Sequence, residues 1–177
     1  MPTPPRLAPQ QAGAGLPEVL IVVLILAILC AVALPSLQET LARIRAETLR
    51  GQLVSVLSTA RSTAITQRRV IGACPSSDGG TCGHDWSHGW LLYVAAPPSA
   101  PDGTAVELLL VEQRPRAALQ AAGTRDRVEF RADGRTRVDN LTIRICMGPA
   151  LHSEVVVSVP GRVRSQRPRG TAPCSRN

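Results

Sequence analysis

The feature that most constrains this chain is an uncharged apolar run from Val19 to Leu34. At about 1.5 Å of rise per helical residue, this run and its flanks are long enough to cross a lipid bilayer. One carboxylate, Glu18, stands at the start of the run, where a charge is costly unless it has a partner. The run therefore predicts a membrane-spanning helix whose first turn needs a cation.

Three kinds of N-terminal signal compete for this run. The small residues 31–33 would suit an ordinary cleaved signal peptide. A lipoprotein signal would end at Cys30, but Leu29 is too large for the preceding position. The third kind is cut on the cytoplasmic side, ahead of the apolar run. Glu18 favours this third kind, because a plain signal peptide has no use for a carboxylate there.

The segment from Gly13 to Val19 resembles the prepilin peptidase site of type IV pilins and pseudopilins. This resemblance implies cleavage after Gly13, so residues 1–13 would be a leader and Ala14 the mature N-terminus. Glu18 would then be the fifth mature residue, where the family carries its glutamate. In the family that glutamate is neutralised during filament assembly by the N-terminal ammonium of a neighbouring subunit.

Pro35 supports the same cleavage register, because it falls where many pilins carry a helix-kinking proline. Two residues depart from the pattern. Ala14 stands where the family usually has Phe, and Pro17 replaces an aliphatic residue. A proline in the first helical turn lacks no needed donor, so Pro17 is compatible with a helix start.

After Pro35, apolar residues recur at spacings of three and four, which indicates an amphipathic helix with one face packed on a domain. We expect the N-terminal helix to occupy residues 14–69, with a membrane-spanning part at about 16–37. The apolar positions beyond the span are Leu37, Leu41, Ile44, Leu49, Leu53, Val56, Leu57, Ala60, Ala64 and Ile65, with Thr48 among them.

Beyond residue 70 the period shifts towards two, which is typical of strands separated by turns. The expected strands are 70–74, 89–95, 105–112, 127–132, 141–147 and 153–159. The fold class is therefore α+β: a long N-terminal helix packed on a small antiparallel β domain spanning residues 70–177.

A narrower resemblance begins at the run Cys74–Gly79, followed by Cys82, Trp86 and Trp90. This pattern resembles the GspH/FimT family of minor pilins and pseudopilins, and it is most like the FimT branch. The resemblance implies an exported domain carried in a filament, with other pilins and the prepilin peptidase as partners. Localisation would be the inner membrane before assembly and the pilus afterwards, with the β domain periplasmic or extracellular.

The domain's four cysteines predict two disulfides if this part is exported. Of three possible connectivities we prefer the local one, in which Cys74 pairs with Cys82 and Cys146 with Cys174. His84 and His88 stand near the first pair, but the spacing fits no standard zinc finger. We expect no metal site and no cofactor. No nucleophile-elbow, phosphate-loop or H-E-x-x-H motif is present, so we expect no enzyme.

The net charge of +7 points to an anionic partner, and the basic excess is greatest in a C-terminal tail at about 160–177. No acid follows Glu154. Guanidinium groups match phosphate oxygens in pairs, so this tail could hold a DNA backbone without reading sequence. The candidate DNA-binding residues are Gly161, Arg162, Arg164, Arg167 and Arg169.

The run Gly161-Arg162-Val163-Arg164 also resembles the Gly-Arg-x-Arg motif of FimT proteins that bind DNA during natural transformation. This resemblance implies a minor type IV pilin that binds double-stranded DNA during uptake. The alternatives for the tail are a solubilising role, or contact with anionic lipid or another pilin. The alternative function is a structural subunit, either a FimU-like minor pilin that primes assembly or a GspH-like pseudopilin of type II secretion.

Overall fold

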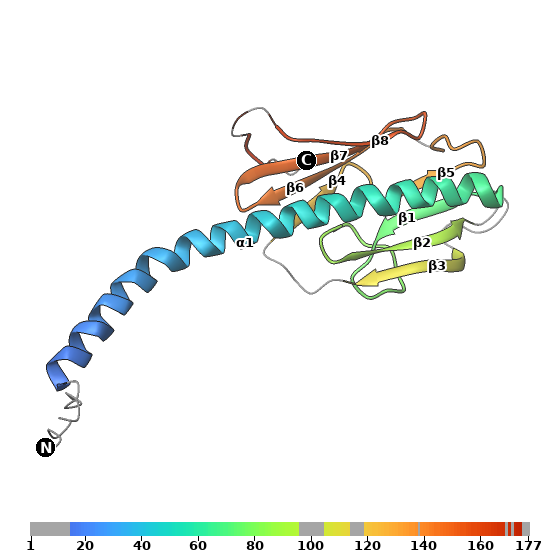
Figure 1. Ribbon diagram of the computed structural model, residues 1–177. Coiled ribbons are helices and arrows are strands. Elements are labelled where there is room, and N and C mark those ends of the chain that lie inside the picture. Colours follow the sequence, from blue (N-terminus) through green and yellow to red (C-terminus); the bar gives the residue numbers. More distant parts are fainter. Residues whose placement is uncertain are drawn as a thin grey trace, which may run out of the picture. The chain divides into compact units, whose positions relative to one another are not determined.

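The computed structural model of the chain describes residues 15–95, 105–113, 119–137, 139–168, 170 and 172–174 (Figure 1). It contains one long helix followed by strands. The elements are α1 (Leu16–Gln67), β1 (Ile71–Pro75), β2 (Gly89–Ala95), β3 (Ala105–Gln113), β4 (Leu119–Gly123), β5 (Val128–Phe130), β6 (Leu141–Met147), β7 (Ala150–Val157) and β8 (Val163–Gln166). The cleavage site predicted at Gly13 and Ala14 lies outside the described residues.

Helix α1 is continuous through Pro35 and ends close to the expected position. Arg68, the residue after its end, has a φ of 52°, and the backbone N–H of Arg69 donates to the carbonyl of Ala64 at 3.3 Å. A left-handed residue at this position, with a bond reaching back into the last turn, is a common way to end a helix.

The first part of α1 is apolar and lies outside any core of this chain. Its most apolar 18-residue window has a mean hydropathy of 3.0 and none of it is buried. Among the described residues, α1 is the one helix long and apolar enough to cross a membrane. This stretch is suited to membrane anchoring.

The second part of α1 carries the residues that pack on the domain. They are Ala46, Leu49, Leu53, Val56, Leu57, Ala60 and Ala64, at the helical spacing that the sequence predicts. Leu37, Leu41 and Ile44 belong to the same predicted series but stay 55, 41 and 56% exposed. The stripe of apolar residues therefore continues beyond the part of the helix that this chain's own core covers.

Two four-stranded antiparallel sheets pack with α1 around one core. Their strand orders are β3-β2-β1-β5 and β4-β6-β7-β8. The largest buried side chains include Trp86, Trp90 and Phe130, and one continuous cluster joins them to α1 and to strands of both sheets. The expected α+β class, a long helix on a small antiparallel β domain, is confirmed.

The strand predictions are closest where the apolar pattern is strong, as a continuous run in β2 and as alternation in β6. Strands β2 and β6 have the predicted bounds, while β4 and β8 were not predicted. Strand β4 is rich in small residues, and β8 lies between Pro-Gly and Arg-Pro pairs that favour loops. The correction matters for function, because the expected basic tail begins with a paired strand, β8, at the edge of its sheet.

Candidate nucleic-acid interface

The β7–β8 turn depends on Gly161. Its N–H donates to the carbonyl of Ser158 at 2.7 Å, and the N–H of Ser158 donates to the carbonyl of Arg162 at 3.1 Å. Gly161 has a φ of 79°, and a Cβ placed on it would lie 1.8 Å from the carbonyl oxygen of Gly134. Only glycine meets both demands. Gly161 therefore shapes the turn that leads into β8, and the structure gives it no side chain with which to contact a ligand.

Arg162 and Arg164 flank Val163, which is partly buried and packs against the core. Because successive side chains of a strand point to opposite faces, Arg164 points away from the core, whereas Arg162 precedes the strand and lines a hollow beside α1. Both residues are exposed. Arg164 lies opposite Val156 of β7, which carries no charge. Within the described part of the chain, neither guanidinium makes an ion pair.

Arg167, just beyond the other end of β8, has a different environment. Its guanidinium pairs with the carboxylate of Glu47 on α1. Arg50 pairs with the same carboxylate at 2.7 Å and donates to the hydroxyl of Ser165 at 3.2 Å. His152 lies 3.4 Å from Glu47. Arg167 is thus tied to its own chain, and the predicted residue Arg169 lies outside the described residues.

The electrostatics of this corner keep Glu47 charged and His152 neutral. Burial alone would raise the pKa of Glu47, but the hydrogen bond from Arg167 and the charge of Arg50 outweigh it and lower the pKa. Burial lowers the pKa of His152, and the nearby cations of Arg167 and Arg50 add to this, against the opposing charge of Glu47. One carboxylate therefore serves two guanidinium groups, and the imidazole adds no charge near neutral pH.

Two disulfides close the loops around this domain. Cys74 is joined to Cys82, and Cys146 of β6 to Cys174, with Cα separations of 5.6 and 6.0 Å. Beyond β8 the chain returns to β7, where the N–H of Cys174 donates to the carbonyl of Pro149 at 2.8 Å. The segment after β8 is therefore tethered at this point.

Two of the five arginines in residues 125–139 have an ion-pair partner within the described part of the chain. Arg125 contacts Asp139 at 2.6 Å, and Arg137 contacts Glu129 at 3.1 Å. His84, which stood near the cysteines in the sequence, lies 2.7 Å from Asp126 instead. Such exposed pairs contribute little to stability. They also neutralise arginines that could otherwise compete with those of β8 for an anion.

The processing and assembly residues lie at the other end of the chain. Glu18 sits in the first turn of α1, where its N–H donates to the carbonyl of Gly15 at 2.9 Å. The neighbouring side chains are exposed and apolar, and Glu18 has no cationic partner among the described residues. The pairing that the sequence analysis expects would have to come from outside these residues.

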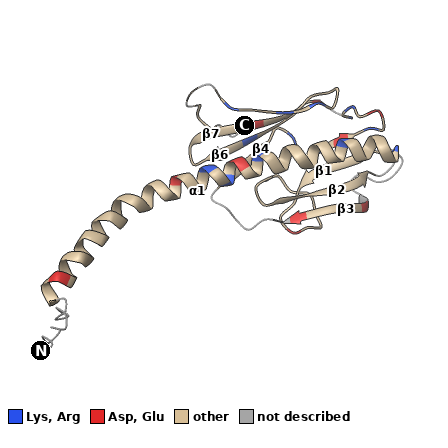
Figure 2. Ribbon diagram, viewed as in Figure 1, with Lys and Arg blue, Asp and Glu red and all other residues tan. Residues whose placement is uncertain are grey.

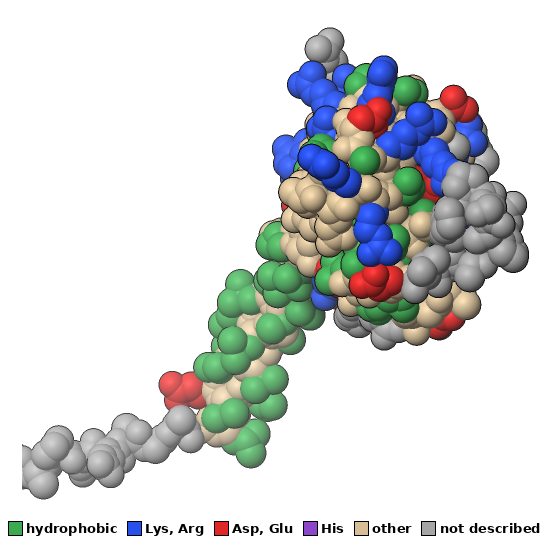
Figure 3. Space-filling view, turned by 90° about the vertical axis from the view of Figure 1, so that its right-hand side faces the viewer, with side chains coloured by type: hydrophobic (Ala, Val, Ile, Leu, Met, Phe, Trp, Pro, Cys, Tyr) green, Lys and Arg blue, Asp and Glu red, His purple; other side chains and the backbone are tan. Residues whose placement is uncertain are grey.

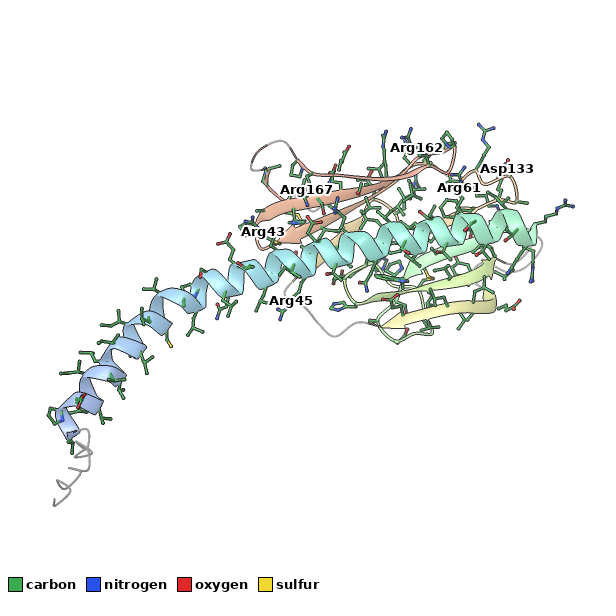
Figure 4. The ribbon with its side chains drawn as sticks, viewed as in Figure 1. Arg43, Arg45, Arg61, Asp133, Arg162 and Arg167 are labelled. Carbon is green, nitrogen blue, oxygen red and sulfur yellow. A yellow bond between two sulfur atoms is a disulfide. The ribbon has the colours of Figure 1, made fainter. Side chains whose placement is uncertain are left out.

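Sequence reasoning missed the arginines that α1 contributes beside β8. Arg43, Arg50 and Arg61 are spaced by seven and eleven residues, which at 3.6 residues per turn places them on one side of the helix. Figure 4 shows Arg61 close to Arg162, with Arg45 on the opposite side of α1. Figure 2 marks the basic positions along α1 and the strands, and Figure 3 shows several basic side chains on the face of the domain that it draws. The helical spacing was the signal available in the sequence.

This architecture is shared with proteins of known structure. Two solved structures of the type IV minor pilin FimU of Pseudomonas aeruginosa share the fold. One has a TM-score of 0.56 at 22% identity and covers 71% of this chain and 96% of its own. The other has a TM-score of 0.57 at 23% identity and covers 76% and 95%. None of the curated proteins matches the sequence significantly.

The family comparison rests on sequence. Residues 51–161, which hold the second half of α1's packing face and the strands up to the Gly161 turn, match the family described as "Type II transport protein GspH". Together with the apolar N-terminal helix and the pilin fold, this match identifies the chain as a member of the GspH/FimT family of minor type IV pilins and pseudopilins.

Proposed function

We propose that this chain is a minor pilin that binds double-stranded DNA through Arg162 and Arg164 during DNA uptake in natural transformation. The observation that supports this is that Arg162, just before β8, and Arg164, within it, are both exposed and have no carboxylate partner among the described residues. Arg125 and Arg137 are already engaged within the chain, as are Arg50 and Arg167 at Glu47.

The geometry of the pair suits a nucleic-acid backbone. Two residues of a strand advance about 6.8 Å, and one DNA strand advances about 3.4 Å per nucleotide. The guanidinium of Arg162 and that of Arg164 would therefore reach phosphates about two nucleotides apart along the axis. The aromatic side chains of this chain, Trp86, Trp90, Tyr93 and Phe130, are all buried. The contact would therefore be to the DNA backbone and would not depend on base sequence.

A salt series tests the proposal. The processed full-length protein in a neutral detergent is titrated into a labelled DNA duplex, and binding is followed by fluorescence anisotropy between about 50 and 200 mM salt. The double variant Arg162→Gln with Arg164→Gln should lose about two units of slope in log K against log salt. The matched control is Arg45→Gln with Arg68→Gln, which removes the same charge from exposed positions away from β8. Equal binding by both double variants would refute the DNA contact.

We further propose that filament assembly uses the N-terminal residues. Prepilin peptidase would cleave after Gly13 at the inner membrane, and the ammonium group of Ala14 would meet Glu18 of a neighbouring subunit. An uncompensated carboxylate in lipid is costly, which supplies the driving force for that pairing. Glu18→Ala should leave processing intact and abolish recovery of the subunit in sheared filaments. Normal recovery of this variant would rule the pairing out.

The second candidate is a structural subunit without DNA contact, either a FimU-like minor pilin that primes assembly or a pseudopilin of type II secretion. The exposed continuation of the apolar stripe, Leu37, Leu41 and Ile44, favours this candidate as much as the first, since it suits packing against neighbouring subunits. It predicts that wild-type protein and the arginine variants show the same weak affinity for duplex DNA.

A further inference from the structure

A hollow of about 340 Å³ lies between α1 and β8, beside the arginine pair and on the helix side of the strand. Its lining is mostly polar and comes from both elements: Ser58, Arg61, Ser62, Ile65, Arg162 and Val163. Two of these residues carry guanidinium groups and two carry hydroxyl groups. The family resemblance assigns no role to the helical residues among them.

Arg61 is held in place by backbone carbonyls. Its Nε donates to the carbonyl oxygen of Gly134 at 3.0 Å, and its Nη2 lies 3.5 Å from that of Pro160. A Cβ on Gly134 or Gly161 would come within 3.2 or 3.0 Å of this Nε, so both glycines leave room for the arginine. A guanidinium group has five N–H donors, so both hydrogens of Nη1 and one of Nη2 are not engaged by these carbonyls.

The hydroxyl groups add donor capacity without adding negative charge. Ser62 donates to the carbonyls of Ser58 and Thr59, each at 3.1 Å, whereas the Ser58 hydroxyl makes no hydrogen bond within the described residues. The acid nearest along the chain to this contact is Asp133, whose Oδ1 accepts the backbone N–H of Arg135 at 3.0 Å. Among the described residues, the lining of the hollow thus contributes two cations, Arg61 and Arg162, and no carboxylate.

We propose that this hollow, which we call the α1–β8 groove, binds a phosphate of the DNA backbone between Arg61 and Arg162. The inference rests on the proposed function and extends it. Arg162 would hold two neighbouring contacts together, one with Arg164 on the outer face of β8 and one with Arg61 in the groove. A guanidinium fixed by two carbonyls loses little side-chain entropy on binding, and a phosphate oxygen can accept from both arginines at once.

The test places a carboxylate in the groove without touching either arginine. Ser58→Glu is read against Thr59→Glu, which makes the same charge change one residue away, about 100° further round the helix. Both positions are exposed, and neither side chain makes a hydrogen bond that the change would remove. Full-length protein in neutral detergent is titrated with duplex DNA across the salt series, and thermal unfolding by circular dichroism checks that each variant is folded.

The groove predicts that Ser58→Glu lowers affinity about tenfold at 50 mM salt and reduces the salt slope by about one unit. Thr59→Glu should lower affinity by less than about threefold, because an exposed charge outside the groove is screened. Inorganic phosphate at millimolar concentration should also compete less well with duplex DNA for the Ser58→Glu variant than for the wild-type protein. Equal behaviour of the two glutamate variants overturns the groove. If the Arg162 and Arg164 double variant still loses binding in that case, the proposed function stands without it; if that variant is also unchanged, both proposals fail.

Discussion

The two ends of β8 carry the same kind of side chain in opposite states. At the β7–β8 turn, Arg162 is exposed and has no carboxylate partner among the described residues, while at the other end Arg167 is bound to Glu47. The difference arises from one residue of α1. A basic strand is therefore a poor guide to where an anion binds until the carboxylates of neighbouring elements are located, because one well-placed acid neutralises an arginine that the sequence shows as free.

The largest effect is expected when the β7–β8 turn, which precedes Arg162, is disrupted. Gly161→Ala should destabilise the domain by about 3 kcal/mol or more, since it combines a left-handed φ with a Cβ in contact with the Gly134 carbonyl. Gly148→Ala is the control, with a φ of 57° and open space around its Cβ. It should cost about 1 kcal/mol. Urea unfolding measures both, and similar losses would contradict the role assigned to the clash.

A smaller effect is expected when the acid that neutralises Arg167, at the far end of β8, is removed. Glu47→Gln releases Arg50 and Arg167 from their ion pairs. We expect affinity for duplex DNA to rise about threefold to tenfold, with a salt slope steeper by about one unit. Adding Arg167→Gln to this variant should cancel the gain, whereas Arg167→Gln alone should change binding little. Additive effects of the two changes would show that Glu47 does not restrain Arg167.

The smallest expected effect is the contribution of Glu47 to stability at acid pH. The folded-state pKa of Glu47 is lowered, so its carboxylate stabilises the fold above the ordinary glutamate pKa of about 4.3, and this contribution is lost as pH falls through the lower folded value. The difference in melting temperature between wild type and Glu47→Gln should be constant from about pH 6 to 8 and should shrink below about pH 4. A difference that persists in strong acid would assign the effect to packing.

Local patterns in the sequence predicted much of this molecule. The apolar run, the helical spacing from Leu49 to Ala64 and the alternation of β6 each depend on neighbouring residues, so they predicted α1 and the central strands. The arginines of β8 were found through a motif resemblance, although their strand was missed because its flanking residues favour loops.

What the sequence could not provide was contact between distant segments. Arg167 and Glu47 are 120 residues apart, and Arg61 and Gly134 are 73 apart. Neither pair follows from periodicity or motif. The neutralised end of β8 at Arg167 and the groove beside Arg162 both arise from these contacts with α1. The sequence ranked Arg162 above Arg167 through a motif, but it could not show that Glu47 neutralises Arg167.

The bond between Cys146 and Cys174 has a mechanical consequence for an edge strand. Among the described strands, β8 pairs with β7 alone, so a load applied to its side chains would tend to strip it from the sheet. The segment beyond it is fastened covalently to β6, and the segment before it is locked at the Gly161 turn. A ligand that pulls on this edge would therefore strain a closed loop anchored at both ends, and β8 could not unzip from a loose terminus.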